Sequence, residues 1–241
     1  MSERFEAAEL RGLYRAIFER RDVRGEFLTQ SLPDELLERL LEAAHHAPSV
    51  GFMQPWRFIL IRDAETRTRV HDIFARASER AAGTYDSERQ AAYRRLKLAG
   101  LREAPLHLCV VCDETSSRGA GLGRQTMPET ALYSVVCAVQ NLWLAARAEG
   151  VGVGWVSILD VDELRALLEI PAQATVVAYL CVGYVSGFHG TPDLERAQWE
   201  ARVPLAEVCF EERYGRAARF AHTEPRKRGH PPRSGNGSSR S

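Results

Sequence analysis

The spacing of apolar residues predicts helices along much of the chain. Between positions 32 and 44, leucines and an alanine return on one helical face, and Pro33 with two following acids suits a first helical turn. The same periodicity predicts helices over 1–19, 64–82, 129–149 and 161–168. The helix at 129–149 is the most apolar of these. Residues 84–101 are more polar and are interpreted either as a mobile lid or as an ordinary surface helix.

Short apolar runs predict strands at 56–61, 106–112 and 175–185, with a further short strand at 208–214. The runs at 56–61 and 106–112 are expected to be buried, and the second is apolar almost throughout, as in strands covered on both faces. An arm punctuated by glycine and proline spans 184–204. These elements predict one domain over 1–221, followed by a basic tail over 222–241 that is expected to be disordered because it has hardly any bulky apolar residues.

The balance of basic and acidic residues excludes a strong electrostatic field from a net charge on the protein. The 241 residues include 32 basic and 32 acidic side chains, so neither a nucleic acid nor a membrane is an expected partner. The five cysteines lie mostly in apolar runs and are interpreted as reduced core residues, which favours a cytoplasmic protein. No apolar run approaches the ~20 residues of a membrane span, and no signal-peptide pattern is present.

A proline-rich loop separates the predicted helix at 32–44 from the predicted strand at 56–61. Pro48, Ser49, Gly51 and Pro55 prevent regular structure and leave backbone N–H groups available to a ligand. The Gln54 amide can both donate and accept, as the edge of a heteroaromatic ring requires. The alternative is an ordinary helix-to-strand loop.

Charged residues interrupt the chain after the first predicted helix. Arg20, Arg21 and Arg24 repel one another unless an anion lies among them, and arginine suits phosphate oxygens. The cluster is therefore either a phosphate clamp or a solvated charged turn. Asp22 does not suit pure phosphate binding, so it either orients the arginines or takes part in chemistry.

Ser157 follows the glycines at 150, 152 and 154, which allow the backbone to approach something planar. This serine is interpreted either as a functional hydroxyl or as the cap of the next helix.

Three other patterns are set aside. The glycines at 118–123 lack the spacing and context of a dinucleotide-binding turn. Cys109 and Cys112 have zinc-like spacing, but positions three apart on a strand face opposite sides, so no metal site is expected there or at His45 and His46. No Gly-x-Ser-x-Gly elbow is present for a hydrolase.

Four motifs together resemble the nitroreductase-like flavoproteins. They are Arg-Arg-Asp-Val-Arg at 20–24, Ala-Pro-Ser-Val-Gly-Phe-Met-Gln-Pro-Trp at 47–56, Gly-Leu-Gly-Arg-Gln-Thr-Met-Pro-Glu at 121–129, and Gly-Val-Gly-Trp-Val-Ser at 152–157. The resemblance runs from about Arg20 to Tyr214. It implies an α+β fold with a mainly antiparallel sheet surrounded by helices, a homodimer formed through the helix at 129–149, and FMN bound at the subunit interface.

The resemblance also implies which residues bind FMN. Arg20, Arg21 and Arg24, in one segment with Asp22 and Val23, would hold the phosphate, and Arg213 would add a weaker contact. Ser49, Met53 and Gln54 would line the isoalloxazine, with Leu98 and Ser157 also near the ring.

Within the family, the motifs resemble the branch that breaks reduced FMN down with dioxygen. The products implied are 5,6-dimethylbenzimidazole, which is the lower ligand of cobalamin (vitamin B12), and erythrose 4-phosphate. Reduced FMN would then be a substrate supplied by a separate reductase, Asp22 a base or proton relay, and Ser157 a hydrogen-bond donor near flavin N5. The alternatives are an NAD(P)H-dependent nitroreductase-type enzyme that retains its FMN, and a non-catalytic flavin-binding protein.

Overall fold

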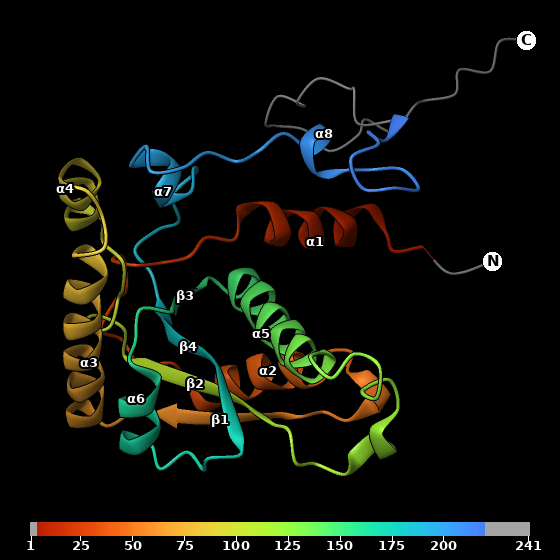
Figure 1. The fold of residues 1–241 in the computed structure, drawn as a ribbon, viewed down its shortest axis with the longest axis horizontal. Helices are drawn as coiled ribbons and strands as arrows, with labels where there is room; N and C mark the ends of the chain where they lie inside the picture. Colours follow the sequence, from red (N-terminus) through yellow and green to blue (C-terminus); the bar gives the residue numbers. More distant parts are fainter. Residues whose placement is uncertain (1–3, 220–241) are drawn as a thin grey trace, which may run out of the picture.

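The fold is built on a four-stranded antiparallel sheet. The computed structural model describes residues 4–219, so the predicted disordered tail at 222–241 lies outside the described residues. The strands are β1 (Trp56–Ile61), β2 (Leu106–Asp113), β3 (Val151–Val156) and β4 (Ala174–Tyr184), in the order β1-β2-β4-β3 (Figure 1). The expected mainly antiparallel sheet is confirmed.

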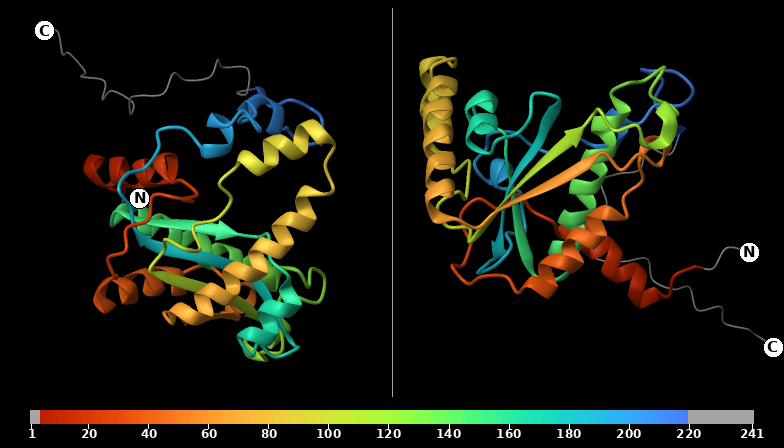
Figure 2. Two further views of the ribbon diagram at one scale, coloured as in Figure 1. Left: turned by 90° about the vertical axis from the view of Figure 1, so that its left-hand side faces the viewer. Right: turned by 90° about the horizontal axis from the view of Figure 1, so that it is seen from below.

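Helices cover both faces of this sheet. α2 (Asp34–His45) and α5 (Thr130–Ala148) pack on one face, while α3 (Ala64–Ala82) and α6 (Val161–Leu167) lie on the other (Figure 2). Along β2, Leu108 and Cys112 point into the first core and Cys109 and Val111 into the second. Because Cys109 and Cys112 lie on opposite faces, they cannot share a metal ion, as their spacing on a strand predicted.

The remaining elements lie at the ends of the sheet. They are α1 (Ala7–Glu19), η1 (Val50–Phe52), α4 (Ser87–Arg95), η2 (Arg118–Gly121), α7 (Asp193–Arg196) and α8 (Leu205–Val208). α1 contacts the end of α5, where the Arg147 guanidinium donates to the Glu19 carboxylate at 2.8 Å. After β4 the chain leaves the sheet and runs past α7 to α8 (Figure 1).

Two strand predictions need correction. β1 is an edge strand with exposed Arg57 and Leu60, so it is only partly buried. The predicted strand at 208–214 is wrong, because α8 ends at Val208 and only an isolated bridge from Phe210 to Ala217 follows. Apolar alternation there lacks a neighbouring strand, since the arm has already left the sheet. The helices predicted at 32–44, 64–82, 129–149 and 161–168 are confirmed to within two residues at each end. The helix predicted over 1–19 spans only Ala7–Glu19, and the segment at 84–101 is helical only over Ser87–Arg95.

Large apolar side chains remain exposed on α1 and α5. On α1 they include Phe18, which is 70% exposed, and Tyr14; on α5 they include Tyr133 and Val136. The strong apolar character of α5 therefore exceeds what the core of one chain uses. A search of the described residues finds no helix with the length and hydropathy needed to cross a bilayer.

A buried polar pair lies in the second core. His107 is fully buried, and its Nε2–H donates to the Leu101 carbonyl at 3.0 Å. Since that nitrogen is the donor, Nδ1 of the neutral ring accepts the Tyr179 hydroxyl at 2.8 Å. Burial, reinforced by the charge of Arg67, lowers the pKa of His107 to about 3. In the folded protein the ring therefore stays neutral near pH 6.5, where His107 of the unfolded chain gains its proton.

This pair predicts acid-sensitive stability. The unfolded chain gains a proton at His107 near pH 6.5, whereas the folded protein resists protonation to about pH 3, so stability falls as the pH falls between these values. At about pH 4.5 the cost is about 2–3 kcal/mol. Between pH 7 and 4.5, the free energy of unfolding of His107→Gln, measured by urea unfolding, should fall less than that of the unsubstituted protein. The difference should be about 2–3 kcal/mol. The matched control is His46→Gln, at an exposed position, and equal pH slopes in all three proteins would contradict the assignment.

Candidate functional site

The arginine segment after α1 lies along the edge of the sheet. Asp22 and Val153 form a parallel bridge, in which the Val23 N–H donates to the Val153 carbonyl at 3.0 Å. A Cβ on Gly154 would lie 2.1 Å from the Val23 carbonyl oxygen, so only glycine allows this approach. The expectation that these glycines face a planar ligand is corrected at Gly154, because the protein's own chain occupies that space.

The Asp22 carboxylate connects this segment to β3. Its Oδ2 accepts hydrogen bonds from Arg24 Nε at 2.9 Å and Nη2 at 2.7 Å, and its Oδ1 accepts the Trp155 backbone N–H at 2.8 Å. A bidentate pair of this kind fixes the plane of the guanidinium. The interpretation that Asp22 orients an arginine therefore matches the observed geometry, while a role in proton transfer stays a prediction.

Arg24 retains one donor for an anion. Its side chain is 15% exposed, and its Nη1 is buried without a hydrogen-bond partner among the described residues. A buried charged donor left unpaired is unfavourable, so a ligand oxygen at this position would stabilise it. The residues present therefore fit a phosphate.

Arg20 adds a second cation near Asp22. Its guanidinium lies 4.7 Å from the centre of the Trp143 ring. Burial lowers the pKa of Arg20, Asp22 raises it, and the charge of Arg202 in the arm lowers it again. A bound anion would offset both the burial and the repulsion.

Two members of the predicted set point elsewhere. The Arg21 guanidinium donates to the carbonyls of Phe18, Arg20 and Gly190, which turns it toward the arm. The Val23 side chain is 3% exposed and belongs to the second core, so any ligand contact of Val23 would come from its backbone. A phosphate contact of Arg21 stays a prediction, since its guanidinium is directed toward these carbonyls.

The Ser49–Gln54 loop has a well-defined conformation. The Ser49 hydroxyl accepts the Gln54 backbone N–H at 3.1 Å. Phe52 and Gln54 both have positive φ, which is unusual outside glycine and turns Met53 inward between them. Met53 is only 1% exposed while Phe52 is 71% exposed. Met53 therefore packs in the core, and Phe52, which was not predicted, stands at the surface.

The other predicted residues lie in three places. Leu98 lines a cavity of about 310 Å³ between α3 and α4, together with Phe74 and Tyr93. Ser157 is exposed directly after β3 and does not cap α6, because the Asp160 carboxylate accepts the Glu163 N–H there. Arg213 lies in an exposed turn after α8, and no hydrogen bond in the described residues joins its guanidinium to the arginine segment.

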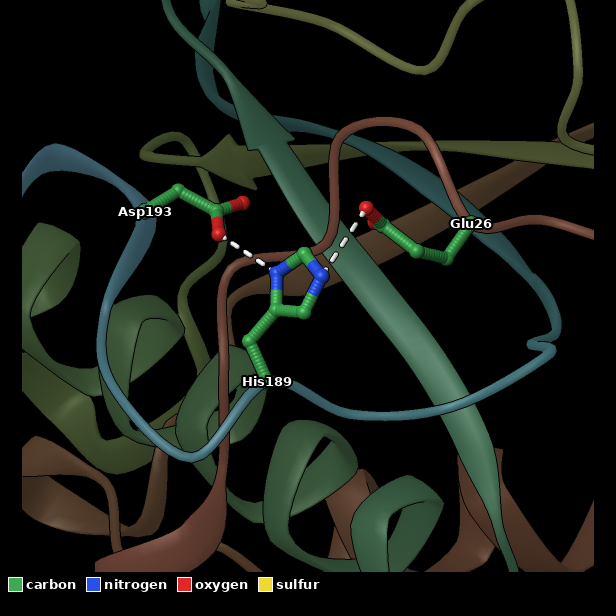
Figure 3. A group of neighbouring side chains, drawn as sticks. All are labelled: Glu26, His189 and Asp193. Carbon is green, nitrogen blue, oxygen red and sulfur yellow. Dashed lines mark hydrogen bonds and ion pairs between the residues drawn. The ribbon is translucent and has the colours of Figure 1, made fainter. Parts of the chain in front are cut away.

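A histidine bridges the arginine segment and the arm (Figure 3). His189 Nδ1 lies 2.7 Å from the Asp193 carboxylate, and Nε2 lies 3.6 Å from Glu26, two residues after Arg24. The three side chains have the composition of a metal site. However, the Arg196 guanidinium already donates to the same Asp193 oxygen at 3.0 Å. The group thus has its own cation and serves to attach the arm.

The two predicted ligand segments lie at opposite ends of the sheet. Trp56, just after the Ser49–Gln54 loop, pairs with Cys112, which pairs with Thr175 near the start of β4. Asp22 pairs with Val153, which is opposite Val182, seven positions further along β4, or roughly 23 Å away. In Figure 1, β1 begins on the right and the chain after α1 runs on the left. One chain therefore does not bring the two segments together.

Basic residues that sequence patterns did not indicate also lie near these segments. The Lys97 side chain passes within 2.9 Å of the position that a Cβ on Gly25 would occupy. The charge of Arg202 lowers the pKa of Arg20. The Arg118 guanidinium donates to the Gln54 amide oxygen. Each lies far in sequence from the segment that it approaches, so no local pattern identifies the contact.

Comparisons with known proteins identify the family. The model of the nitroreductase family matches residues 17–184. The chain is 52% identical to a 5,6-dimethylbenzimidazole synthase of Rhodospirillum rubrum, over 78% of this chain and 90% of that protein. It is 40% identical to a protein of the same name from Rhodobacter capsulatus, over 77% of this chain and 89% of that protein.

A solved structure shares the fold. The crystal structure of oxidised iodotyrosine deiodinase bound to FMN and 3-iodo-L-tyrosine matches with a TM-score of 0.62 and 25% identity, over 73% of this chain and 91% of that one. The family match, the synthase relatives and this structure agree with the sheet and helices described above. The chain therefore belongs to the nitroreductase family of flavin-binding proteins, on the branch that contains the 5,6-dimethylbenzimidazole synthases of Rhodospirillum and Rhodobacter.

Proposed function

We propose that this chain is a 5,6-dimethylbenzimidazole synthase, an oxygenase-type oxidoreductase. It would fragment reduced FMN with dioxygen to 5,6-dimethylbenzimidazole, for the lower ligand of cobalamin, and erythrose 4-phosphate. The observation that carries the proposal is the 52% identity over 90% of the Rhodospirillum rubrum synthase. The Arg20–Arg24 segment supports it, because Arg24 has a buried donor with no partner among the residues that the structure describes, at the position proposed for the phosphate.

FMN is the substrate in this proposal, and its reduced ring supplies the electrons that activate dioxygen. Arg20 and Arg24 hold its phosphate, and Arg21 and Arg213 remain candidates for further contacts. Ser49, Met53, Gln54 and Leu98 lie along the ring, with Ser157 donating near N5. A separate flavin reductase delivers the reduced flavin.

The site is proposed to be shared between two copies of the chain. The roughly 23 Å of strand between the arginine segment and the glutamine loop prevents one chain from gripping one flavin with both. Exposed apolar residues on α5, such as Tyr133 and Val136, offer the surface for a homodimer. Each flavin would then meet the arginines of one subunit and the loop of its partner, in a chamber that excludes water.

Asp22 is proposed to move a proton during cleavage of the ribityl chain. Its Oδ1 accepts one hydrogen bond, from Trp155, and retains a lone pair near the proposed phosphate site. Its Oδ2 is fully occupied by Arg24. The same carboxylate thus positions the arginine through one oxygen and can act as a base through the other.

A product assay tests the proposed function. The protein is incubated with excess reduced FMN in air, and loss of flavin and appearance of 5,6-dimethylbenzimidazole are followed by chromatography. Flavin recovered intact, with steady oxidation of NADH by a nitroarene, would instead identify a nitroreductase-type enzyme. Tight flavin binding with no turnover in either assay would identify a non-catalytic flavin-binding protein.

Asp22→Asn should reduce the rate of benzimidazole formation by about 100-fold or more, the usual size of a general-base effect. It should weaken FMN binding by less than about tenfold, because one amide oxygen still accepts a hydrogen bond. The matched variant Arg24→Lys breaks the bidentate pair and keeps the carboxylate. If Asp22 acts only through Arg24, both variants lose affinity and rate in the same proportion, and the base role is wrong.

Ser157→Gly should separate flavin oxidation from product formation. Among the described residues no hydrogen bond engages the Ser157 hydroxyl, which is exposed after β3 and is proposed to donate to the flavin. Without this donor, reduced FMN should be oxidised with release of hydrogen peroxide and about tenfold less benzimidazole per flavin consumed, as for a lost hydrogen bond to a charged group. Equal coupling in both proteins would refute the role.

A further inference from the structure

The Arg118 side chain contacts Gln54 across two loops. Arg118 begins η2, and its Nη2 donates to the Gln54 Oε1 at 3.1 Å. No other acceptor for this guanidinium is found in the part of the chain the structure describes. An isolated arginine thus pairs with the one amide side chain of the proposed flavin loop.

This contact determines which way the amide points. A guanidinium has only donors, so the atom that faces Arg118 must be the amide oxygen. The Gln54 nitrogen then faces away from Arg118 and offers its two N–H groups. Of the two roles expected for this amide, the Arg118 contact therefore favours donation to a ligand.

The surrounding backbone also fixes the conformation of the chain at Gln54. A Cβ on Gly119 would lie 2.3 Å from the Gly51 carbonyl oxygen, so the two loops touch through their backbones. Gln54 itself has φ +52°, and its N–H is held by Ser49. Since strained residues persist only where their surroundings determine them, the position of Gln54 is set, and the orientation of its amide is what remains.

From this geometry we propose that Arg118 is a positioning residue that acts through Gln54. It holds the amide so that its NH₂ group donates to an acceptor on the flavin ring, a carbonyl oxygen or an unprotonated ring nitrogen. The inference rests on the proposed function, because it takes a flavin as the ligand of this loop. It adds a specificity element: the loop selects a ring edge that presents an acceptor.

A purely structural role for Arg118 has a matched control in the same loop. Arg124 donates to the carbonyls of Glu114 at 3.2 Å and Ser116 at 3.3 Å, so it braces the loop without contacting Gln54. Arg118→Met and Arg124→Met remove side chains of the same size and charge. Only the first should change how Gln54 meets the ligand.

The test is a double-mutant cycle on binding of oxidised FMN to the whole protein, measured by quenching of flavin fluorescence. Arg118→Met should weaken binding about fivefold, as for one lost hydrogen bond, while Arg124→Met should stay within about twofold. The double variant Arg118→Met with Gln54→Ala should bind no more weakly than Gln54→Ala alone, because Arg118 acts only through the amide. Independent effects, or equal losses in Arg118→Met and Arg124→Met, would overturn the proposal.

Gln54→Glu tests the direction of the hydrogen bond. A carboxylate still pairs with Arg118 but has no donor, so this variant should bind FMN at least as weakly as Gln54→Ala. If Gln54 instead accepts from the ring, Gln54→Glu binds more tightly than Gln54→Ala, and the proposal is wrong. Thermal unfolding of each variant identifies losses that come from misfolding.

These measurements involve no turnover, so they are separate from the test of function. An absence of benzimidazole in the product assay would refute the proposed reaction and leave the binding cycle interpretable. Additivity in the cycle would refute only the role of Arg118.

Discussion

The structure depends on one carboxylate, that of Asp22, which joins the arginine segment to the edge of the sheet. Hydrogen bonds to charged groups contribute about 1.5–3 kcal/mol, and Asp22 accepts two from Arg24 in addition to the Trp155 N–H. Without these bonds, the largely buried Arg24 charge would lose its carboxylate partner. The approach also requires Gly154, since any side chain there would collide with the Val23 carbonyl. The Asp22 side chain and the close backbone approach that Gly154 permits thus hold the segment together.

The same segment continues into the contacts that attach the arm and α4. Phe27 pairs with Val185, and the Ser186 N–H donates to the Glu26 carbonyl at 2.9 Å, so the arm leaves β4 from a fixed position. Further along, Trp199 packs against Tyr85 beside α4, and the Arg89 guanidinium lies 4.0 Å from its ring. A continuous series of contacts therefore joins the arginine segment, the arm and α4.

The arginine segment and the glutamine loop lie at opposite ends of the sheet, and α5 leaves apolar side chains exposed. The proposed shared site would use both features, since a flavin held by the arginines of one subunit would meet the glutamine loop of a second copy. In the loop half, the close approach of Gly51 and Gly119 sets how the two loops pack. In the arginine half, Arg24 Nη1 has no hydrogen-bond partner within residues 4–219. The loop half is thus defined by its backbone packing, and the arginine half by its positive charge.

Local sequence determined much of this protein. Apolar periodicity placed the helices and three of the four strands, because burying one face has a fixed spacing in each kind of element. The alternation along β2 also separated Cys109 from Cys112 correctly. The motifs at 20–24, 47–56, 121–129 and 152–157 placed the chain in its family. Only the tertiary structure decided how these parts meet: that Asp22 pairs with Arg24, that Arg21 turns to the arm, that Met53 points inward, and that Arg118 reaches Gln54. These contacts depend on chain direction and on distances between residues remote in sequence, neither of which a local pattern contains.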